Sequence, residues 1–365
     1  MNPERDPLLS TATAHTSATA TSTTSTSSTV SYLKGDGKLY TKTIINTLLL
    51  VVIAFLALNE ITPIFSTTPT NPNFHGWALP SASIKEIHMD LHGAHWDVTV
   101  HKGVYANSLF SVDVESTDWT LQQSTIVFAN VDPTKNERVL VRVEFPWWKW
   151  FYSPIVKIKL VVNLSSDLAE FKTVGEDVRL VWQSVNVNTS FVVSTKRGSV
   201  NLLTPISTKV MDIQVAESGY LGIFNCSVSD RVVLKTGEGD VEAQALVGYK
   251  ELSVETGMGN VMMGLVPGIQ DSKNSIVVSG EGLMTLVVYG FKGRFTVDAP
   301  EGAARYSGTD WPLERNNPDV GTVGGKGVGK GTLLARITKR GMATLDFYPN
   351  NTTLPSSAVN LFNMH

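Results

Sequence analysis

The sequence has little cysteine and no excess of charge of either sign. One cysteine, Cys226, in 365 residues excludes an intrachain disulfide framework. The 30 basic and 33 acidic residues give a formal net charge of −3, so nothing indicates a nucleic-acid partner. The run 324–332 is similar to a phosphate-binding loop, but Gly331 stands where a Mg²⁺-binding Ser or Thr is required. We therefore predict no cofactor and no catalytic residue.

One pattern occurs twice within residues 232–265. Val-Val-Leu-Lys-Thr-Gly-Glu-Gly-Asp-Val-Glu-Ala, starting at Val232, is followed 20 positions later by Leu-Ser-Val-Glu-Thr-Gly-Met-Gly-Asn-Val-Met-Met. Each copy predicts two short strands with a glycine corner between them, because glycine tolerates the positive φ of a sharp turn. Alternation predicts one inward set and one outward set of side chains. The inward set is Val232, Leu234, Val241, Ala243 and Ala245, and the outward set is Asp240, Glu242 and Gln244.

The second glycine of the corner marks further copies, at Gly198, Gly219, Gly239, Gly259, Gly282, Gly302 and Gly341. Successive spacings are 21, 20, 20, 23, 20 and 39 residues, and the last is long because residues 308–331 interrupt the period as an insertion. A fixed period of this size predicts strands stacked on neighbouring copies. The predicted fold class is therefore all-β, a repeat β-solenoid of about 20 residues per coil over residues 84–348.

These Thr-Gly-x-Gly-[Asp/Asn]-Val repeats resemble the putative-adhesin family, domains of unknown function found in bacteria and fungi. The resemblance covers residues 84–348 and implies a β-solenoid with an adhesion role. It supplies no site residues.

The N-terminal stretch 1–42 is predicted to be a disordered cytosolic tail, because residues 10–31 are almost wholly Ser, Thr and Ala. A glycosylated stalk is the alternative interpretation. Glu4, Leu8 and Leu9 match an acidic dileucine signal that sorting adaptors read.

Residues 43–61 are apolar enough to predict a transmembrane signal anchor, since about 20 residues cross a bilayer as a helix. Lys34, Lys38 and Lys42 precede this span, which places the N-terminus in the cytosol. The predicted protein is a single-pass type II membrane glycoprotein of the vacuolar, endosomal or plasma membrane. A Pro-rich stalk is expected at 62–83 and a C-terminal tail at 349–365.

All the glycosylation sequons follow the predicted anchor, which agrees with this orientation. Their asparagines are Asn163, Asn188, Asn225, Asn350 and Asn351.

Four of the seven histidines lie close together in the sequence, at His88, His92, His95 and His101. Imidazole clusters bind transition metals or sense acid. Their spacing matches no defined metal motif, so a solvated outward face is the competing interpretation.

The run 145–152 holds six aromatic residues in eight positions. An exposed run would be a contact site for a sugar, a partner or a membrane interface. A buried run would be a lid over the end of the repeats. The candidate contact residues are Trp147, Trp148, Trp150, Phe151 and Tyr152.

Two functions follow from these patterns. The first is a membrane-tethered binding, adhesion or scaffold module with a glycan or protein ligand. The second is a membrane-anchored carbohydrate-active enzyme, which requires paired carboxylates on neighbouring repeats. The outward positions after the corner glycines offer no such pair, which favours the binding module.

Overall fold

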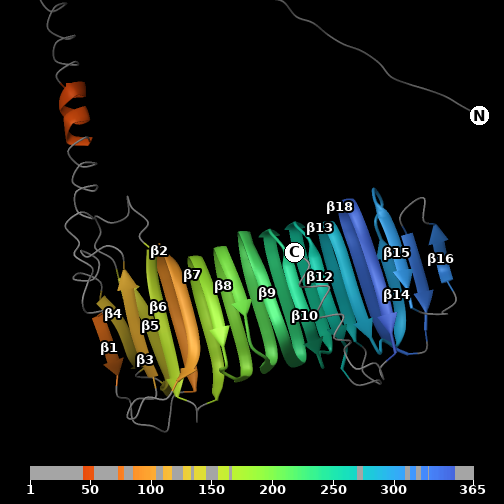
Figure 1. Cartoon of the computed structure of the whole chain (residues 1–365), viewed down its shortest axis with the longest axis horizontal. Helices are drawn as coiled ribbons and strands as arrows, with labels where there is room; N and C mark the ends of the chain where they lie inside the picture. The colour runs from red at the N-terminus through yellow and green to blue at the C-terminus, as the bar shows by residue number, and fades with distance from the viewer. Residues whose placement is uncertain are drawn as a thin grey trace, which may run out of the picture. The chain divides into compact units, whose positions relative to one another are not determined.

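The computed structural model describes two units of the chain, Met1–Phe65 and Ser66–His365, each considered by itself. In the first unit it describes a helix over residues 44–52. In the second it describes residues 73–77, 85–103, 110–116, 126–132, 135–144, 155–163, 167–268, 274–308, 313–317, 322–327 and 329–349. The described part of the second unit consists of strands that lie side by side in a row (Figure 1).

The described residues of the second unit form 18 strands that pair into one sheet. The first nine are β1 (Asn73–Trp77), β2 (Glu86–Gly103), β3 (Phe110–Ser116), β4 (Ile126–Asp132), β5 (Lys135–Glu144), β6 (Ile155–Asn163), β7 (Leu168–Gln183), β8 (Val187–Leu202) and β9 (Ile206–Glu238). The remaining nine are β10 (Val241–Val247), β11 (Glu251–Met258), β12 (Val261–Val266), β13 (Ser275–Tyr289), β14 (Gly293–Asp298), β15 (Ala303–Ser307), β16 (Leu313–Asn317), β17 (Thr322–Lys326) and β18 (Gly331–Tyr348).

The repeated pattern forms strands as predicted. Copies 20 residues apart pair in parallel, with Leu252 opposite Val232 in β11 and β9, and Val261 opposite Val241 in β12 and β10. The five side chains expected to face inward in the first copy are buried: Val232, Leu234, Val241, Ala243 and Ala245. Burial of alternate β-branched and aliphatic side chains therefore fixes the register of these strands.

The long strands bend near their middle and contribute to two rows of pairing. The first half of β7 pairs with the first half of β8, and their second halves pair beyond the corner at Gly198. Rings from both halves meet between the rows, because Trp182 lies 4.5 Å from Phe171 and 5.0 Å from Phe191, measured between ring centroids. The two rows thus enclose one hydrophobic core.

The corners require glycine. Gly239 has a φ of +136°, and a Cβ atom there would collide with the carbonyl oxygen of Gly219 in the preceding copy. Gly259, with a φ of +150°, stands in the same relation to Gly239. The backbones approach too closely at each corner for a side chain to fit.

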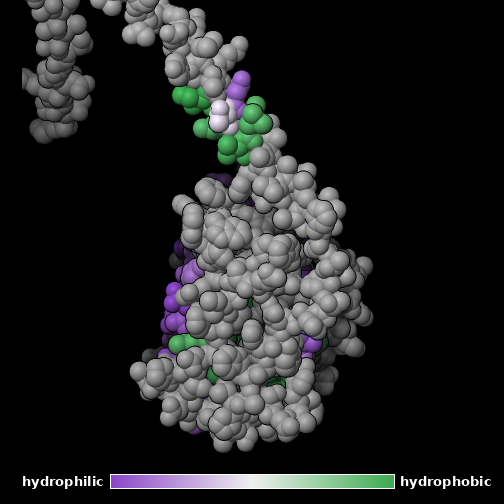
Figure 2. Space-filling view, turned by 90° about the vertical axis from the view of Figure 1, so that its left-hand side faces the viewer, coloured by the Kyte–Doolittle hydropathy of each residue, from purple (hydrophilic) through white to green (hydrophobic). Residues whose placement is uncertain are grey.

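The predicted transmembrane anchor is wrong. Within the described residues no helix is long and apolar enough to cross a membrane. The helix that the structure describes in this unit covers residues 44–52. Its surface is mainly hydrophobic (Figure 2), and Leu50 is 66% exposed. The predicted location, an integral protein of the vacuolar, endosomal or plasma membrane with a cytosolic N-terminus, depended on this anchor and is therefore also wrong.

The predicted solenoid, a simple succession of equal coils, is also wrong. The last strand, β18, pairs in parallel with β13 on one side and with β14 and β15 on the other, so it lies between copies that precede it in the chain. In the middle of the unit, β9, β10, β12, β13 and β11 pair in parallel around a closed ring. Apolar alternation specifies that a strand has a buried face, but it leaves open which strand becomes its neighbour.

Antiparallel pairing replaces parallel pairing toward both ends of the unit. β4 pairs with β5, and β3 pairs with both β1 and β6. Within the stretch 308–331, expected as an insertion, β16 and β17 pair antiparallel, and β17 also pairs with β14. β1 lies within the stretch expected as a stalk.

Candidate functional site

The four histidines singled out in the sequence all lie on β2, but the structure does not bring them into one cluster. Nε2 of His92 lies 2.8 Å from Oδ1 of Asp90 on the same strand. His88 and His95 instead contact the carboxylates of Glu170 and Asp177 on β7. His92 and His95 have side chains 57% and 54% exposed, whereas that of His88 is 19% exposed. His101 is half-buried near the end of the strand.

His88 belongs to a half-buried group on three neighbouring strands, which we call the Glu86 cluster: Glu86, His88, Arg138 and Glu170. Glu86 lies opposite Arg138 of β5 on one side and opposite Glu170 of β7 on the other. Arg138 donates from Nε to Oε2 of Glu86 at 2.7 Å. Nε2 of His88 lies 3.0 Å from Oε1 of Glu170. Each of Glu86, His88 and Glu170 offers one potential metal-ligand atom, and these three atoms lie within 4.8 Å of one another.

The environment of His88 favours its neutral form. Burial lowers its pKa, and the positive charge of Arg138 lowers it further, while the carboxylates of Glu170 and Glu86 oppose both effects. A neutral imidazole is the form that binds metal ions.

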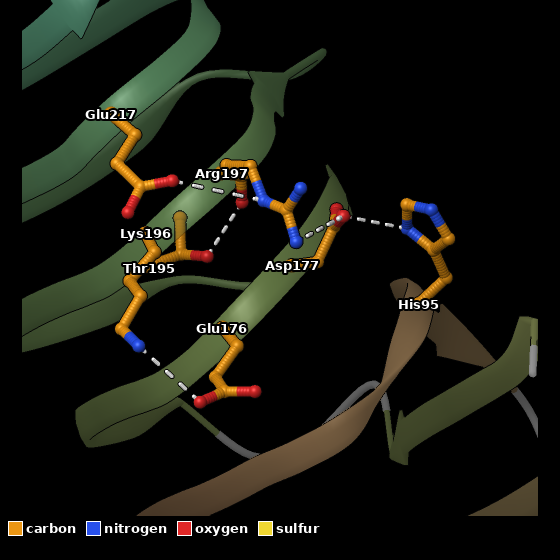
Figure 3. Close-up of polar contacts among 7 residues, drawn as sticks. All are labelled: His95, Glu176, Asp177, Thr195, Lys196, Arg197 and Glu217. Atoms are coloured by element: carbon orange, nitrogen blue, oxygen red, sulfur yellow. Dashed lines mark hydrogen bonds and ion pairs between the residues drawn. The ribbon is translucent and has the colours of Figure 1, made fainter. Parts of the chain in front are cut away.

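His95 begins a row of alternating charges across the corners of β2, β7, β8 and β9 (Figure 3). Its Nδ1 lies 2.8 Å from Oδ2 of Asp177, and the same oxygen lies 3.9 Å from Nη2 of Arg197. Nε of Arg197 lies 3.9 Å from Oε2 of Glu217. Most of these side chains are well exposed, and exposed ion pairs contribute only about 0–1 kcal/mol each. The row helps to align neighbouring copies and is not a ligand site.

Opposite charges recur 20 residues apart elsewhere in the repeats. Lys196 contacts Glu176 at 3.4 Å (Figure 3), and Lys250 contacts Asp230 at 2.9 Å. Pairing of successive copies brings these residues together, and opposite charges in such pairs add modest stability.

A second candidate site is a shallow groove on the outward face of β8, β9 and β10, which we call the Gly222 groove. It has a volume of about 160 Å³. Gly222 lies opposite Asn201 of β8 and Glu242 of β10. The outward side chains around it are those of Asn201, Leu203, Tyr220, Phe224, Glu242 and Gln244.

The ring of Tyr220 lies over Gly222. A Cβ atom added to Gly222 would be 2.7 Å from Cε1 of Tyr220 and 3.2 Å from its hydroxyl oxygen. The hydroxyl donates to Oε2 of Glu242 at 2.7 Å, which fixes the direction of the ring. Burial and this hydrogen bond to a carboxylate raise the pKa of Tyr220, so the phenol stays protonated and keeps the bond.

Hydrophobic side chains also line this groove. Phe224 is 39% exposed and Leu203 is 52% exposed. The groove therefore combines an aromatic ring and apolar side chains with amide and carboxylate groups, the mixture that small-molecule sites use for contact and orientation.

The remaining predicted residues are spread over the chain. Asn188 is exposed and Asn225 is half-buried, whereas Asn163 ends β6. The buried thiol of Cys226 is no nucleophile, because burial raises its pKa to about 11. The sorting residues Glu4, Leu8 and Leu9, the contact residues Trp147, Trp148, Trp150, Phe151 and Tyr152, and the sequon residues Asn350 and Asn351 lie outside the described residues.

Sequence reasoning missed the Gly222 groove and the partners in the Glu86 cluster. A signal for the groove existed, since Gly222 occupies an outward position where neighbouring copies carry Asn201 and Glu242. The partners of His88 could not be found in this way, because Arg138 comes from a strand outside the clear repeats.

No protein-family model and no curated protein matches the chain. Its structure is similar to a "putative adhesin" from Bacteroides fragilis, with a TM-score of 0.40 and 10% identity over 76% of this chain and 98% of that one. A "putative adhesin" from Parabacteroides distasonis gives a TM-score of 0.39 and 12% identity over 76% and 98% of the two chains. A "putative cell adhesion protein" from Clostridium sporogenes gives a TM-score of 0.23 and 8% identity over 76% of this chain and 100% of that one.

The names of these neighbours describe two adhesins and one cell adhesion protein. Identities of 12% or less at such TM-scores do not show a family.

Proposed function

We propose that the second unit is an adhesion-type binding module that takes a carbohydrate in the Gly222 groove. The observation that carries this proposal is the ring of Tyr220, which lies over Gly222 and is held there by Glu242. The flat faces of aromatic rings pack well against the apolar C–H face of a pyranose. Asn201, Glu242 and Gln244 lie beside the ring, where they can hydrogen-bond the sugar hydroxyls.

The composition of the groove supports binding without hydrolysis. Glycoside hydrolysis generally requires two carboxyl groups about 5–9.5 Å apart. The described lining of the groove holds one carboxylate, Glu242, which already accepts the hydrogen bond from Tyr220. The enzyme alternative therefore has weaker support at this site than the binding module.

Parallel pairing also supports a role in adhesion. Successive copies present their outward side chains at intervals of about 4.8 Å, one strand spacing. A surface with such regular spacing suits a polymeric ligand, since each sugar beyond the first adds contacts on neighbouring strands.

The test is binding of the full chain to an array of neutral and acidic oligosaccharides, followed by titration calorimetry with the best binder. Tyr220→Ala should weaken binding at least tenfold, because the stacking surface is lost. Gly222→Ala should do the same without removing the ring, because the new Cβ atom displaces it. Met258→Ala, at a residue 51% exposed outside the groove lining, is the matched control and should bind like the original chain.

Thermal melting of each variant separates loss of the site from loss of the fold. Equal binding by folded Tyr220→Ala and by the original chain would refute the groove as the site. Absence of any binding across the array by the original chain would refute the carbohydrate ligand.

A further inference from the structure

We propose that Glu86, His88 and Glu170 form a binding site for a divalent transition-metal ion with the ligand preferences of Zn²⁺. The Glu86 cluster is separate from the Gly222 groove, since it lies on β2, β5 and β7, while the groove lies on β8, β9 and β10. The inference therefore stands independently of the carbohydrate proposal.

The first argument is electrostatic. Glu86 and Glu170 lie directly opposite each other on adjacent strands, where like charges destabilise a sheet. Their side chains are only 20% and 32% exposed, so water screens the repulsion incompletely. Arg138 compensates one of the two negative charges. A divalent cation between the carboxylates would compensate the other.

The second argument concerns the donor atoms. Imidazole nitrogen together with carboxylate oxygen suits zinc and its neighbours in the first transition row, whereas Mg²⁺ and Ca²⁺ take oxygen ligands. Three protein ligands and one water form the usual open tetrahedral zinc site. Glu86 and His88 come from β2, and Glu170 comes from the adjacent β7, so the backbone already holds all three together.

The three potential ligand atoms lie within 4.8 Å of one another. Bonds of about 2.0–2.2 Å to a common ion require these atoms to approach one another more closely. In the metal-free cluster the Nε2–H group of His88 donates to Glu170. Metal binding at Nε2 requires the other tautomer of the neutral ring, in which Nδ1 carries the hydrogen, so the imidazole loses no proton.

The experiment is titration calorimetry of the full chain with ZnCl₂ after removal of metal by a chelator. The original chain should bind one zinc ion at this site, and His88→Ala and Glu170→Gln should each weaken binding at least tenfold. His92→Ala is the matched control, because His92 also contacts a carboxylate on β2 but lies outside the three-ligand group. It should bind like the original chain, and MgCl₂ should give no heat.

A measurement on the unaltered chain covers the case in which a variant fails to fold. Co²⁺ added to the original chain should acquire the strong visible absorption of a four-coordinate site with a nitrogen ligand, and excess Zn²⁺ should remove it. Absence of zinc binding by the original chain would overturn the proposal. So would zinc binding that folded His88→Ala retains in full, or a Co²⁺ spectrum identical to that of the free ion.

Discussion

The Glu86 cluster and the Gly222 groove occupy the same kind of position in two regions of one sheet. In both, outward side chains of three neighbouring strands are brought together by the parallel pairing. At the cluster, half-buried charged groups face one another across the strands. At the groove, a glycine leaves room for an aromatic ring among two amide groups and one carboxylate.

This difference shows that the backbone supplies a common frame, while the residue at each outward position decides the chemistry. A substitution that destabilises the paired strands should therefore abolish binding at both sites. A substitution of an outward side chain should affect binding at one site only. The predictions below follow that order, from the largest expected effect to the smallest.

Replacing the buried Trp182 should reduce the stability of the paired strands most. Trp182 is fully buried, packs against Phe171 and Phe191, and donates from Nε1 to the carbonyl of Val185 at 2.9 Å. We expect Trp182→Ala to lower the free energy of unfolding by about 3–5 kcal/mol. Chemical denaturation monitored by circular dichroism measures the change, and a loss below ~1 kcal/mol would contradict this packing.

A side chain introduced at a corner glycine should reduce the stability of the strands less than the loss of Trp182. Gly239→Val places a β-branched residue at a φ of +136° and against the backbone of Gly219, which should cost about 1–3 kcal/mol. Ser253→Val, at a half-buried strand position with ordinary backbone geometry, is the control and should cost almost nothing. Equal stability of the two variants would show that the corner tolerates a side chain.

Lowering the pH should reduce the stability that the Glu86 cluster contributes, because His88 belongs to that cluster and not to the Gly222 groove. The folded chain holds the pKa of His88 below its usual value of about 6.5, so the unfolded chain binds a proton first as the pH falls. The contribution of neutral His88 is complete above pH ~6.5 and decreases as the pH falls through that value toward the lower folded pKa. Denaturation between pH 7 and pH 5 should show a smaller loss of stability in His88→Gln than in the original chain.

His92→Gln serves as the comparison for that experiment, because His92 lies on the same strand but outside the Glu86 cluster. Arg138, Glu170 and Glu86 act on His88 through their charges. Lys172 lies opposite His88 on β7. An identical pH dependence for the original chain and His88→Gln would exclude the histidine as the source.

The smallest effect should follow from removing the hydroxyl of Tyr220. Tyr220→Phe keeps the ring over Gly222 but loses the hydrogen bond to Glu242, which should cost less than about 1 kcal/mol. Carbohydrate binding should decrease only a few-fold, compared with the large loss in Tyr220→Ala. Titration calorimetry on both variants distinguishes the contribution of the ring from that of the hydroxyl.

Local features of the fold could be predicted from the sequence. The strands, their buried faces and the pairing of Leu252 with Val232 follow from apolar alternation and the glycine period. The position of β18 could not be predicted, because the alternation of Leu333, Ala335 and Ile337 fits the edge of any neighbouring strand. The predicted anchor rested on composition alone, which gives the hydrophobicity of a segment but leaves its helix length undetermined.

The candidate sites were harder to predict than the strands. The sequence drew attention to His88, but its contacts depend on two strands that are distant in sequence, β5 and β7. The groove depends on the space that the missing side chain of Gly222 leaves for the ring of Tyr220. Neither the repeat motif nor the hydropathy of the sequence indicates such a space. Register between neighbouring strands is the information that was missing in both cases.

The place of β18 has a consequence for the gene. Because β18 lies between β13 on one side and β14 and β15 on the other, the last strand that the structure describes fills an interior position of the sheet. A premature stop codon just before Gly331 would therefore remove a strand from the middle of the sheet and not from its end. The product would expose the pairing edges of three strands at once, which makes it a substrate for aggregation or degradation.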